Sequence, residues 1–202
     1  MKHATTVILG GLLALGSGMA LAKTKAGPAV VKRGTMTDKR NGTIYNTVTI
    51  GRQKWMAENL NYPLGSSWCY EGKAENCEKD GQLYDWATAK RVCPQGWHLP
   101  SDDEWSQLEA AVGEPASTRL RSSTGWKDDG NGADAYGFSV LPVGLRTIDG
   151  LFIDIGSHAC FWSATESEAR YAWARFFHSG AADVYRSSGN KIGGFSVRCL
   201  EN

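Results

Sequence analysis

The sequence lacks a net charge of either sign, and this absence bears on its partners. The 202-residue chain has 22 basic and 21 acidic side chains. The first 22 residues contain Lys2 and no acid, so the remainder has 21 of each. A chain without excess basic residues has no general attraction to nucleic acid or to anionic lipid. We therefore expect no nucleic-acid partner.

No two cysteines are spaced as Cys-x-x-Cys, which argues against a zinc ribbon and a thioredoxin-type redox motif. The chain has five cysteines, and the odd number leaves at least one of them unpaired. All five follow a predicted export signal, and an oxidising compartment favours disulfides. They are Cys69, Cys77, Cys93, Cys160 and Cys199.

The chain has no hydrophobic run long enough to cross a membrane. The apolar run from Val7 to Leu15 is short and glycine-rich. Lys2 before it and Ala20-Leu21-Ala22 after it match a signal peptide over residues 1–22. No cysteine lies near the predicted cut, which disfavours a lipoprotein. We expect a secreted or extracellular product, or one held at a bacterial cell surface, with no integral membrane segment after the signal is removed.

Composition divides the remainder into a flexible basic leader, residues 23–34, and one domain, residues 35–202. The domain begins with TDKRNGTIYNTVTIGRQKWMAENL, in which β-branched or aromatic residues alternate with polar ones. Turn signals lie at Asn41-Gly42 and Gly51-Arg52. This pattern predicts a strand meander.

Two helices are predicted in the middle of the chain. The first covers residues 83–93 and ends at Pro94. The second runs from Asp102 to about Val112 and is followed by Gly113. The rest of the chain has short apolar runs between loops, which predict short strands. The fold class expected is therefore α+β.

The stretch CPQGWHLPSDDEW, residues 93–105, brings together residues that could form a reactive site. Cys93 would be the nucleophile, His98 its base, and Asp102 or Asp103 the orienting acid. The scaffold interpretation explains the stretch better, because Ser101 followed by Glu104 is a capping-box signature for a helix start. We expect no catalytic residue here.

Three stretches carry a family resemblance: GTIYNTVTIGRQKWMAENLNY, WCYEGKAENCEKDGQLYDWATAKRVCPQGWHLPSDDEW and GGFSVRCL. They resemble the Fibrobacter succinogenes major paralogous domain, over about residues 34–201. The order of elements is also similar to the C-type lectin-like fold, which formylglycine-generating enzymes share. The resemblance implies two helices and a small, irregular, mainly antiparallel sheet, closed by a disulfide. It implies no settled activity.

The resemblance also suggests a cysteine map. It pairs Cys93 with Cys199, closing the domain, and Cys69 with Cys77, pinning a short loop. Cys160 is then the free thiol. Because Cys160 precedes Phe161 and Trp162 in an apolar strand, we expect it to be buried and inert.

A metal site is a weaker candidate. The loop KDDGNGADAYG is rich in oxygen ligands and glycine, as calcium loops are, but it lacks the EF-hand spacing. A solvated turn-rich loop explains it as well. The Glu-Pro-Asn and Trp-Asn-Asp elements by which sugar-binding C-type lectins hold calcium are absent. Formylglycine-generating enzymes bind copper with two nearby C-terminal cysteines, whereas this chain has only Cys199 in that region. Nothing in the sequence requires a metal shared by His158 and His178. We expect no cofactor, with calcium as the weak candidate at Asp128, Asp129, Asn131 and Asp134.

The strand predicted over residues 171–177 is the best candidate for recognition. Alternation places Tyr171, Trp173, Arg175 and Phe177 on one face, and Ala172, Ala174 and Phe176 on the other. Aromatic rings with arginine can bind sugars or proteins, although single members can equally be core residues. The candidate ligand-binding residues are Trp162, Tyr171, Trp173, Arg175, Phe177, Tyr185 and Arg186.

These patterns favour a secreted or cell-surface, non-catalytic binding module, for polysaccharide or a surface protein. Its ligand surface is expected in the loops after residue 113. One alternative is a metal-dependent enzyme related to the formylglycine-generating enzymes. Another is a structural component of a surface matrix that acts by self-association.

Overall fold

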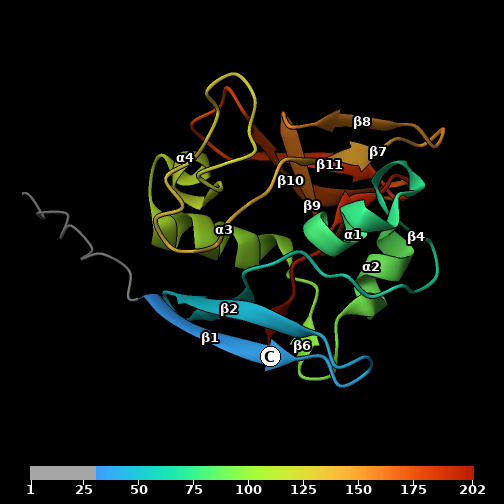
Figure 1. The fold of residues 1–202 in the computed structure, drawn as a ribbon, viewed down its shortest axis with the longest axis horizontal. Coiled ribbons are helices and arrows are strands. Elements are labelled where there is room, and N and C mark those ends of the chain that lie inside the picture. The colour runs from blue at the N-terminus through green and yellow to red at the C-terminus, as the bar shows by residue number, and fades with distance from the viewer. Residues whose placement is uncertain (1–30) are drawn as a thin grey trace, which may run out of the picture.

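The structure, a computed structural model, describes residues 31–202 and has a mixed α+β fold (Figure 1). Within these residues there are four α-helices and two sheets. The helices are α1 (Ala74–Asp80), α2 (Trp86–Val92), α3 (Asp102–Val112) and α4 (Ala116–Leu120), with a 3-10 turn at Tyr70–Gly72. The predicted signal peptide lies outside the described residues. None of the helices in residues 31–202 is long and apolar enough to cross a membrane.

The first sheet contains the predicted meander and has the order β1-β2-β3-β13-β6. Its strands are β1 (Val31–Thr37), β2 (Ile44–Ile50), β3 (Gln53–Met56), β13 (Leu200–Glu201) and β6 (Trp97–His98). All its pairings are antiparallel. Residues 31–34, expected to belong to the leader, pair with β2, and residues 23–30 lie outside the described residues. Lysine and arginine are compatible with this strand, whose side chains are largely exposed.

The second sheet has the order β11-β10-β9-β12-β5-β4, and β7 joins it by pairing with β9. Its path contains β11 (Tyr185–Asn190), β10 (Tyr171–His178), β9 (His158–Glu168), β12 (Phe195–Ser196), β5 (Leu83–Tyr84) and β4 (Ser67–Trp68). Beside it, β7 (Val143–Arg146) forms a hairpin with β8 (Phe152–Ile155). The pairings are mainly antiparallel, as expected, but the expectation of one small sheet is corrected to two sheets.

Helix α3 forms where the sequence predicts it. Ser101 Oγ accepts from the Glu104 backbone N–H at 3.2 Å, and Glu104 Oε2 accepts from the Ser101 N–H at 2.7 Å. This capping box satisfies backbone donors that the helix start would leave free. Gly113 ends the helix with φ +70°.

The other helices differ from the prediction. The helix predicted over residues 83–93 begins only at Trp86, because Leu83 and Tyr84 form β5 and Asp85 is the N-cap. Asp85 Oδ1 accepts from the Thr88 N–H at 2.7 Å. The expected count of two helices is also wrong, since α1 and α4 were missed. Each has at most seven residues, too few for a clear helical period.

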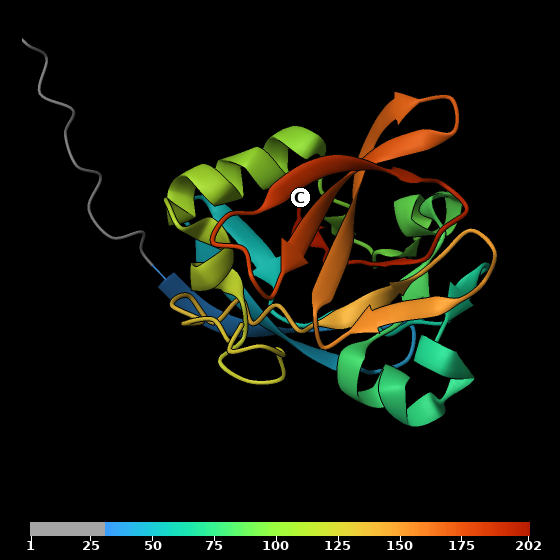
Figure 2. The same cartoon turned by 90° about the horizontal axis from the view of Figure 1, so that it is seen from above.

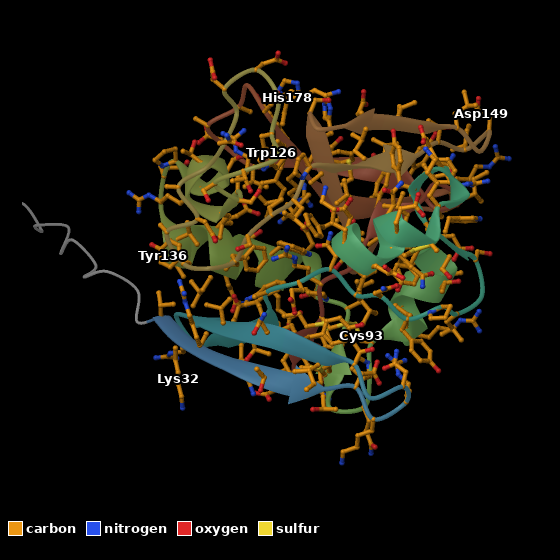
Figure 3. The ribbon with its side chains drawn as sticks, viewed as in Figure 1. Lys32, Cys93, Trp126, Tyr136, Asp149 and His178 are labelled. Atoms are coloured by element: carbon orange, nitrogen blue, oxygen red, sulfur yellow. A yellow bond between two sulfur atoms is a disulfide. The ribbon has the colours of Figure 1, made fainter. Side chains whose placement is uncertain are left out.

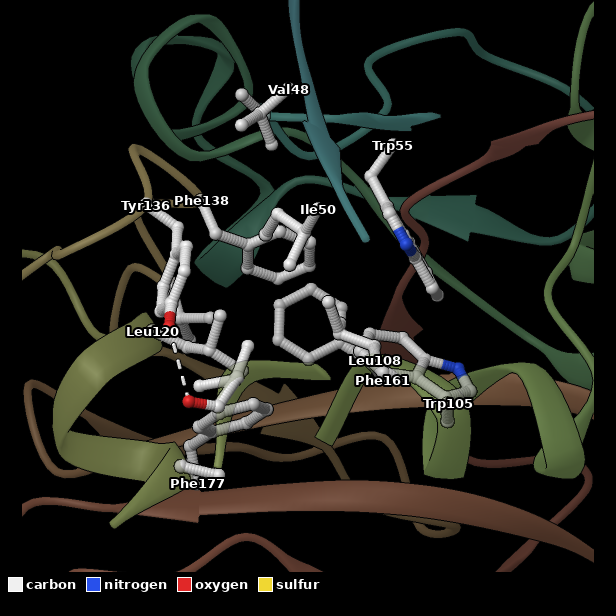
Figure 4. Close-up of a cluster of buried hydrophobic side chains, with 14 of the residues drawn as sticks. Val48, Ile50, Trp55, Trp105, Leu108, Leu120, Tyr136, Phe138, Phe161 and Phe177 are labelled. Carbon is white, nitrogen blue, oxygen red and sulfur yellow. Dashed lines mark hydrogen bonds between the residues drawn. The ribbon is translucent and has the colours of Figure 1, made fainter. Parts of the chain in front are cut away.

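The core lies on both sides of the second sheet. Figure 1 shows α3 between the β1–β2 hairpin and strands β9–β11, and Figure 2 gives the same arrangement from above. The side facing α3 holds a ring cluster that Figure 4 shows in close-up. In it, Trp55 and Trp105 have ring centroids 4.8 Å apart. On the other side, Trp162 stacks on Phe195 at 4.2 Å. Each fully buried large side chain contributes about 1.5–3 kcal/mol to folding.

Both predicted disulfides are confirmed. Cys93 is bonded to Cys199 and Cys69 to Cys77. Cys93 follows α2 and Cys199 precedes β13, so the longer bridge ties the middle of the chain to its last strand. Cys160 is the free cysteine within residues 31–202, and it is fully buried. Burial raises the pKa of its thiol, which keeps it protonated and unreactive.

Candidate functional site

The residues of CPQGWHLPSDDEW have structural partners. Cys93 is in a disulfide. His98 contacts Glu104 through Nε2 at 3.0 Å and Asn202 through Nδ1 at 2.7 Å. Asp102 bonds two arginines. The nucleophile, base and acid considered for this stretch are therefore not assembled, and the scaffold interpretation describes the observed contacts.

The strand predicted to carry recognition residues has the expected alternation, but most of it is buried. Ala172, Ala174 and Phe176 contact the cluster that contains Trp162. Phe177 lies in the cluster that contains Trp105 of α3. The strand is thus packed against the α3 cluster at Phe177 and against the rest of the core at Ala172 and Ala174, whereas Tyr171 at its start stays exposed.

Three of the seven candidate ligand-binding residues are fully buried, namely Trp162, Arg175 and Phe177. Their assignment to an exposed recognition surface is corrected. Trp162 Nε1 donates to the Tyr84 carbonyl at 2.7 Å. Arg175 bonds Asp102 at 2.6 Å and Glu109 at 2.5 Å. A buried guanidinium needs such partners to offset its lost hydration.

The other four candidates reach the surface. Tyr171 is 37% exposed and Tyr185 is 57% exposed. The guanidinium of Arg186 lies 3.3 Å from the centroid of the half-buried Trp173 ring. Arg186 also bonds Asp102, at 2.8 Å. These four residues lie on β10 and β11, and none of them lines either of the two hollows described below.

Two of the four candidate calcium ligands accept hydrogen bonds from the backbone, and the other two are exposed. Asn131 Oδ1 accepts from the Trp126 backbone N–H at 3.1 Å, and Asp134 accepts from the Ser139 N–H at 2.8 Å. Asp128 and Asp129 are exposed and have positive φ. Within residues 31–202 no group of three or more His, Cys, Asp or Glu side chains could hold a metal. The loop satisfies its own backbone, as polar turn residues commonly do.

His158 and His178, which the sequence leaves unrelated, lie opposite each other on β9 and β10. Their ring centroids are 4.5 Å apart in an edge-to-face arrangement. Burial and the neighbouring His178 lower the pKa of His158, while Asp154, 3.7 Å away, opposes this effect. The pair is an aromatic contact, and Figure 3 shows His178 near the edge of the molecule.

A large hollow lies elsewhere, between the first sheet, α1 and the loop before β7. We call it the polar cleft. Its volume is about 600 Å³, within the range of small-ligand sites. Its walls come from four segments that are distant in sequence: the β1–β2 hairpin, residues 57–61, residues 77–81 and residues 134–141. The side chains that line it are mostly polar, including Asn46, Asn59, Asn61, Asp80 and Ser139.

Asp80 is a largely buried carboxylate of the polar cleft whose oxygens still reach solvent. It is only 8% exposed, yet no hydrogen-bond donor among the described residues reaches its carboxylate. Lys79 Nζ is 3.9 Å away on a side chain that is 78% exposed, which makes the pair weak. Burial raises the pKa of Asp80, against the charge of Lys79. Asp80 also ends α1, where the helix dipole disfavours negative charge.

The contacts around Asn59 fix the base of the polar cleft. Asn59 Nδ2 donates to the Asp80 carbonyl at 2.9 Å, and its Oδ1 accepts from Arg198 Nε at 2.9 Å. Arg198 also donates to the carbonyls of Phe138 and Ser139. Gly81, with φ +77°, passes close to Asn59, since a Cβ there would lie 2.7 Å from its Cβ. These contacts connect the base of the polar cleft to residues 77–81 on one side and, through Arg198, to residues 138–139 on the other.

Arg198 is fully buried and has no carboxylate within ion-pair distance in the described structure. Desolvation lowers its pKa to about 9, although Asp134 and Glu58 oppose this effect. Its guanidinium lies 4.6 Å from the centroid of Phe138. Behind the polar cleft it supplies positive potential, which partly balances the carboxylates of the lining.

Sequence reasoning missed the polar cleft. Asp80 is one carboxylate in the charged run EKD, and no local pattern marks it as buried. Arg198 follows an apolar stretch, GGFSV, and an arginine within a predicted buried strand could have been noticed as an unusual residue. Neither signal places the two residues beside the same hollow.

A comparison with known protein families matches residues 48–201 to the Fibrobacter succinogenes major domain. No curated protein and no solved structure matches the chain. The family match covers most of the chain and includes α1, the disulfides and Arg198. The chain belongs to the Fibrobacter succinogenes major domain family.

Proposed function

We propose that the protein is a secreted or cell-surface module that binds polysaccharide in the polar cleft without catalysing a reaction. The observation that carries the proposal is Asp80, a nearly buried carboxylate without a hydrogen-bond donor at the edge of a large hollow. Its oxygens reach the hollow and receive no hydrogen bond from the described residues, so a ligand hydroxyl can donate to them.

The chemistry of the lining favours a hydroxyl-rich ligand. Amide side chains at Asn46, Asn59 and Asn61 can both donate and accept hydrogen bonds. Most small-molecule pockets are mainly apolar, whereas the lining of this one is at least as polar as apolar. Carboxylates, cations and amides all line it, so the hydroxyl groups of a sugar unit find both hydrogen-bond donors and acceptors there.

The scaffold supports the same function. We propose a C-type lectin-like fold for the domain, on the basis of its α+β composition and the bridge from the end of α2 to the last strand. The second bridge pins residues 69–77, next to the wall that holds Asp80. Two disulfides are also typical of exported proteins, which supports the proposed location.

The test is binding of the purified full-length protein to polysaccharides, first on an array and then by calorimetry. Asp80→Asn should weaken binding by about tenfold or more, as loss of a charged hydrogen bond does. It should not destabilise the fold. Asp129→Asn is the matched control, because Asp129 is exposed and its φ of +54° suits asparagine.

Two results would contradict the proposal. One is the absence of binding to any polysaccharide, particularly if a protein ligand is found instead. The other is equal binding by the wild type and Asp80→Asn, which would separate the polar cleft from the activity.

A further inference from the structure

A second hollow lies on the other side of the disulfide-pinned segment. It has a volume of about 510 Å³ and is lined by Trp68, Glu71, Arg146, Gly150 and Phe152, among others. We call it the Trp68–Arg146 groove. Residues of the segment from Cys69 to Gly81 line both hollows. Tyr70, buried within that segment, packs against Phe152 with ring centroids 5.3 Å apart.

Arg146 is the notable residue of the groove. Its guanidinium lies 4.1 Å from the centroid of the Trp68 ring. Its side chain is half-buried, yet within residues 31–202 it makes no hydrogen bond and no ion pair to the protein. Arg40 and Arg175 have carboxylate partners. The buried Arg198 has none, but its guanidinium donates to backbone carbonyls. The donors of Arg146 are therefore free for a ligand.

The position of Arg146 is fixed by its backbone. Its N–H donates to the Gly194 carbonyl at 2.9 Å, and the Gly194 N–H donates back at 2.8 Å. A Cβ at Gly194 would lie 2.9 Å from the Arg146 Cβ and 3.2 Å from Trp68 Cε3. The stack of arginine on tryptophan thus depends on a glycine beside it. A guanidinium held in this way loses little entropy when it binds an anion.

Two carboxylates near the groove have other partners. Glu71 pairs with Lys73 at 2.7 Å. Asp149 accepts from Thr147 Oγ1 at 2.5 Å, and Figure 3 shows it at the outer end of the β7–β8 hairpin. The hydrogen bond from Thr147 lowers the pKa of Asp149, and the charge of Arg146 contributes less. Neither carboxylate lies within 4.0 Å of Arg146 as an ion-pair partner.

We propose that the Trp68–Arg146 groove is an anion subsite that binds the carboxylate of a uronic acid unit, so that the ligand of this protein is an acidic polysaccharide. This rests on the proposed function, because it names the class of polysaccharide. The planar guanidinium fork matches a planar carboxylate through two parallel hydrogen bonds. Phe152 and the edge of Trp68 offer an apolar wall for the flat face of a sugar ring.

The experiment compares two forms of one ligand, an oligogalacturonate and its methyl ester. They have the same backbone and differ in charge. The wild-type protein is expected to bind the acid about tenfold more tightly than the ester, with the difference shrinking at high salt. Arg146→Gln should remove this preference, and Arg146→Lys should restore only part of it, because lysine keeps the charge without the fork.

Asp80→Asn is the matched control. It should weaken binding of the acid and the ester alike and leave their ratio unchanged. Far-ultraviolet circular dichroism and the unfolding midpoint check that each variant is folded.

The outcomes separate the two proposals. If the wild type binds both forms equally, or if Arg146→Gln keeps the preference, the anion subsite is wrong while polysaccharide binding stands. Binding of an acidic peptide through Arg146, with no binding of the oligogalacturonate, also overturns it. If the wild type binds neither these two forms nor any other polysaccharide, both proposals fail.

Discussion

Arg175 Nη1 lies 2.6 Å from Asp102 Oδ1, which joins the buried strand β10 to the first turn of α3. Asp102 also bonds Arg186, and Arg175 also bonds Glu109. This network explains why an arginine can be buried in the centre of the fold. Arg175, which the sequence predicted as a recognition residue, therefore holds β10 against α3.

Replacing Asp102 with Asn should destabilise the fold by about 3 kcal/mol, because it leaves the buried Arg175 with weaker compensation. Denaturant unfolding at pH 7 measures this. Exposed Asp103→Asn, in the same helical turn, is the control and should change the free energy of unfolding by less than about 1 kcal/mol.

The same residue predicts a pH dependence. Burial alone would raise the pKa of Asp102, but hydrogen bonds and charges from Arg186 and Arg175 hold it below its usual range. A lowered folded-state pKa adds stability above the unfolded pKa of about 3.9, and this is lost as the pH falls through the folded value. Unfolding between pH 5 and 2 should show a component that Asp102→Asn lacks. Equal slopes of unfolding free energy against pH for the wild type and Asp102→Asn would contradict this prediction.

The two disulfides should differ in their contributions. They close loops with sequence separations of 106 and 8 residues. The chain-entropy relation gives about 5 kcal/mol for the long loop and about 2.5 kcal/mol for the short one. Paired alanine replacements at Cys93 and Cys199, and separately at Cys69 and Cys77, test the order by denaturant unfolding. A larger loss from the short loop would show that native contacts outweigh loop closure.

Cys160 should be unreactive in the native protein. It is fully buried, and burial raises the pKa of its thiol. A thiol reagent should label no cysteine of the oxidised, folded protein and one cysteine after unfolding in denaturant. Rapid labelling under native conditions would mean that the sheet opens at β9.

Ligand binding in the polar cleft should weaken as the pH falls. Binding through Asp80 requires its ionised carboxylate, and burial raises the pKa of that group. The loss should therefore begin at a higher pH than for an ordinary aspartate, whose pKa is about 3.9. Calorimetry at pH 7 and pH 4.5 measures it. The residual binding of Asp80→Asn should change less over the same range, and an identical change would assign the effect to another group.

The accuracy of the sequence predictions follows the range of the interactions involved. Helix α3 was placed correctly because Ser101 and Glu104 form its cap within four residues. The β1–β2–β3 meander was also found, since alternation and turn glycines are local signals. Helices α1 and α4 were missed because they are too short for a periodic pattern.

The sequence by itself determined the start of α3, the alternation in β10 and, through family resemblance, the pairing of the cysteines. Only the tertiary structure decided that α3 covers Arg175 and Phe177. It also brought Asp80 and Arg198 to one hollow, and Trp68 and Arg146 to another. Local backbone preferences act between near neighbours, whereas burial depends on which distant segments pack together. For that reason the alternation of β10 was visible in the sequence and its exposure was not.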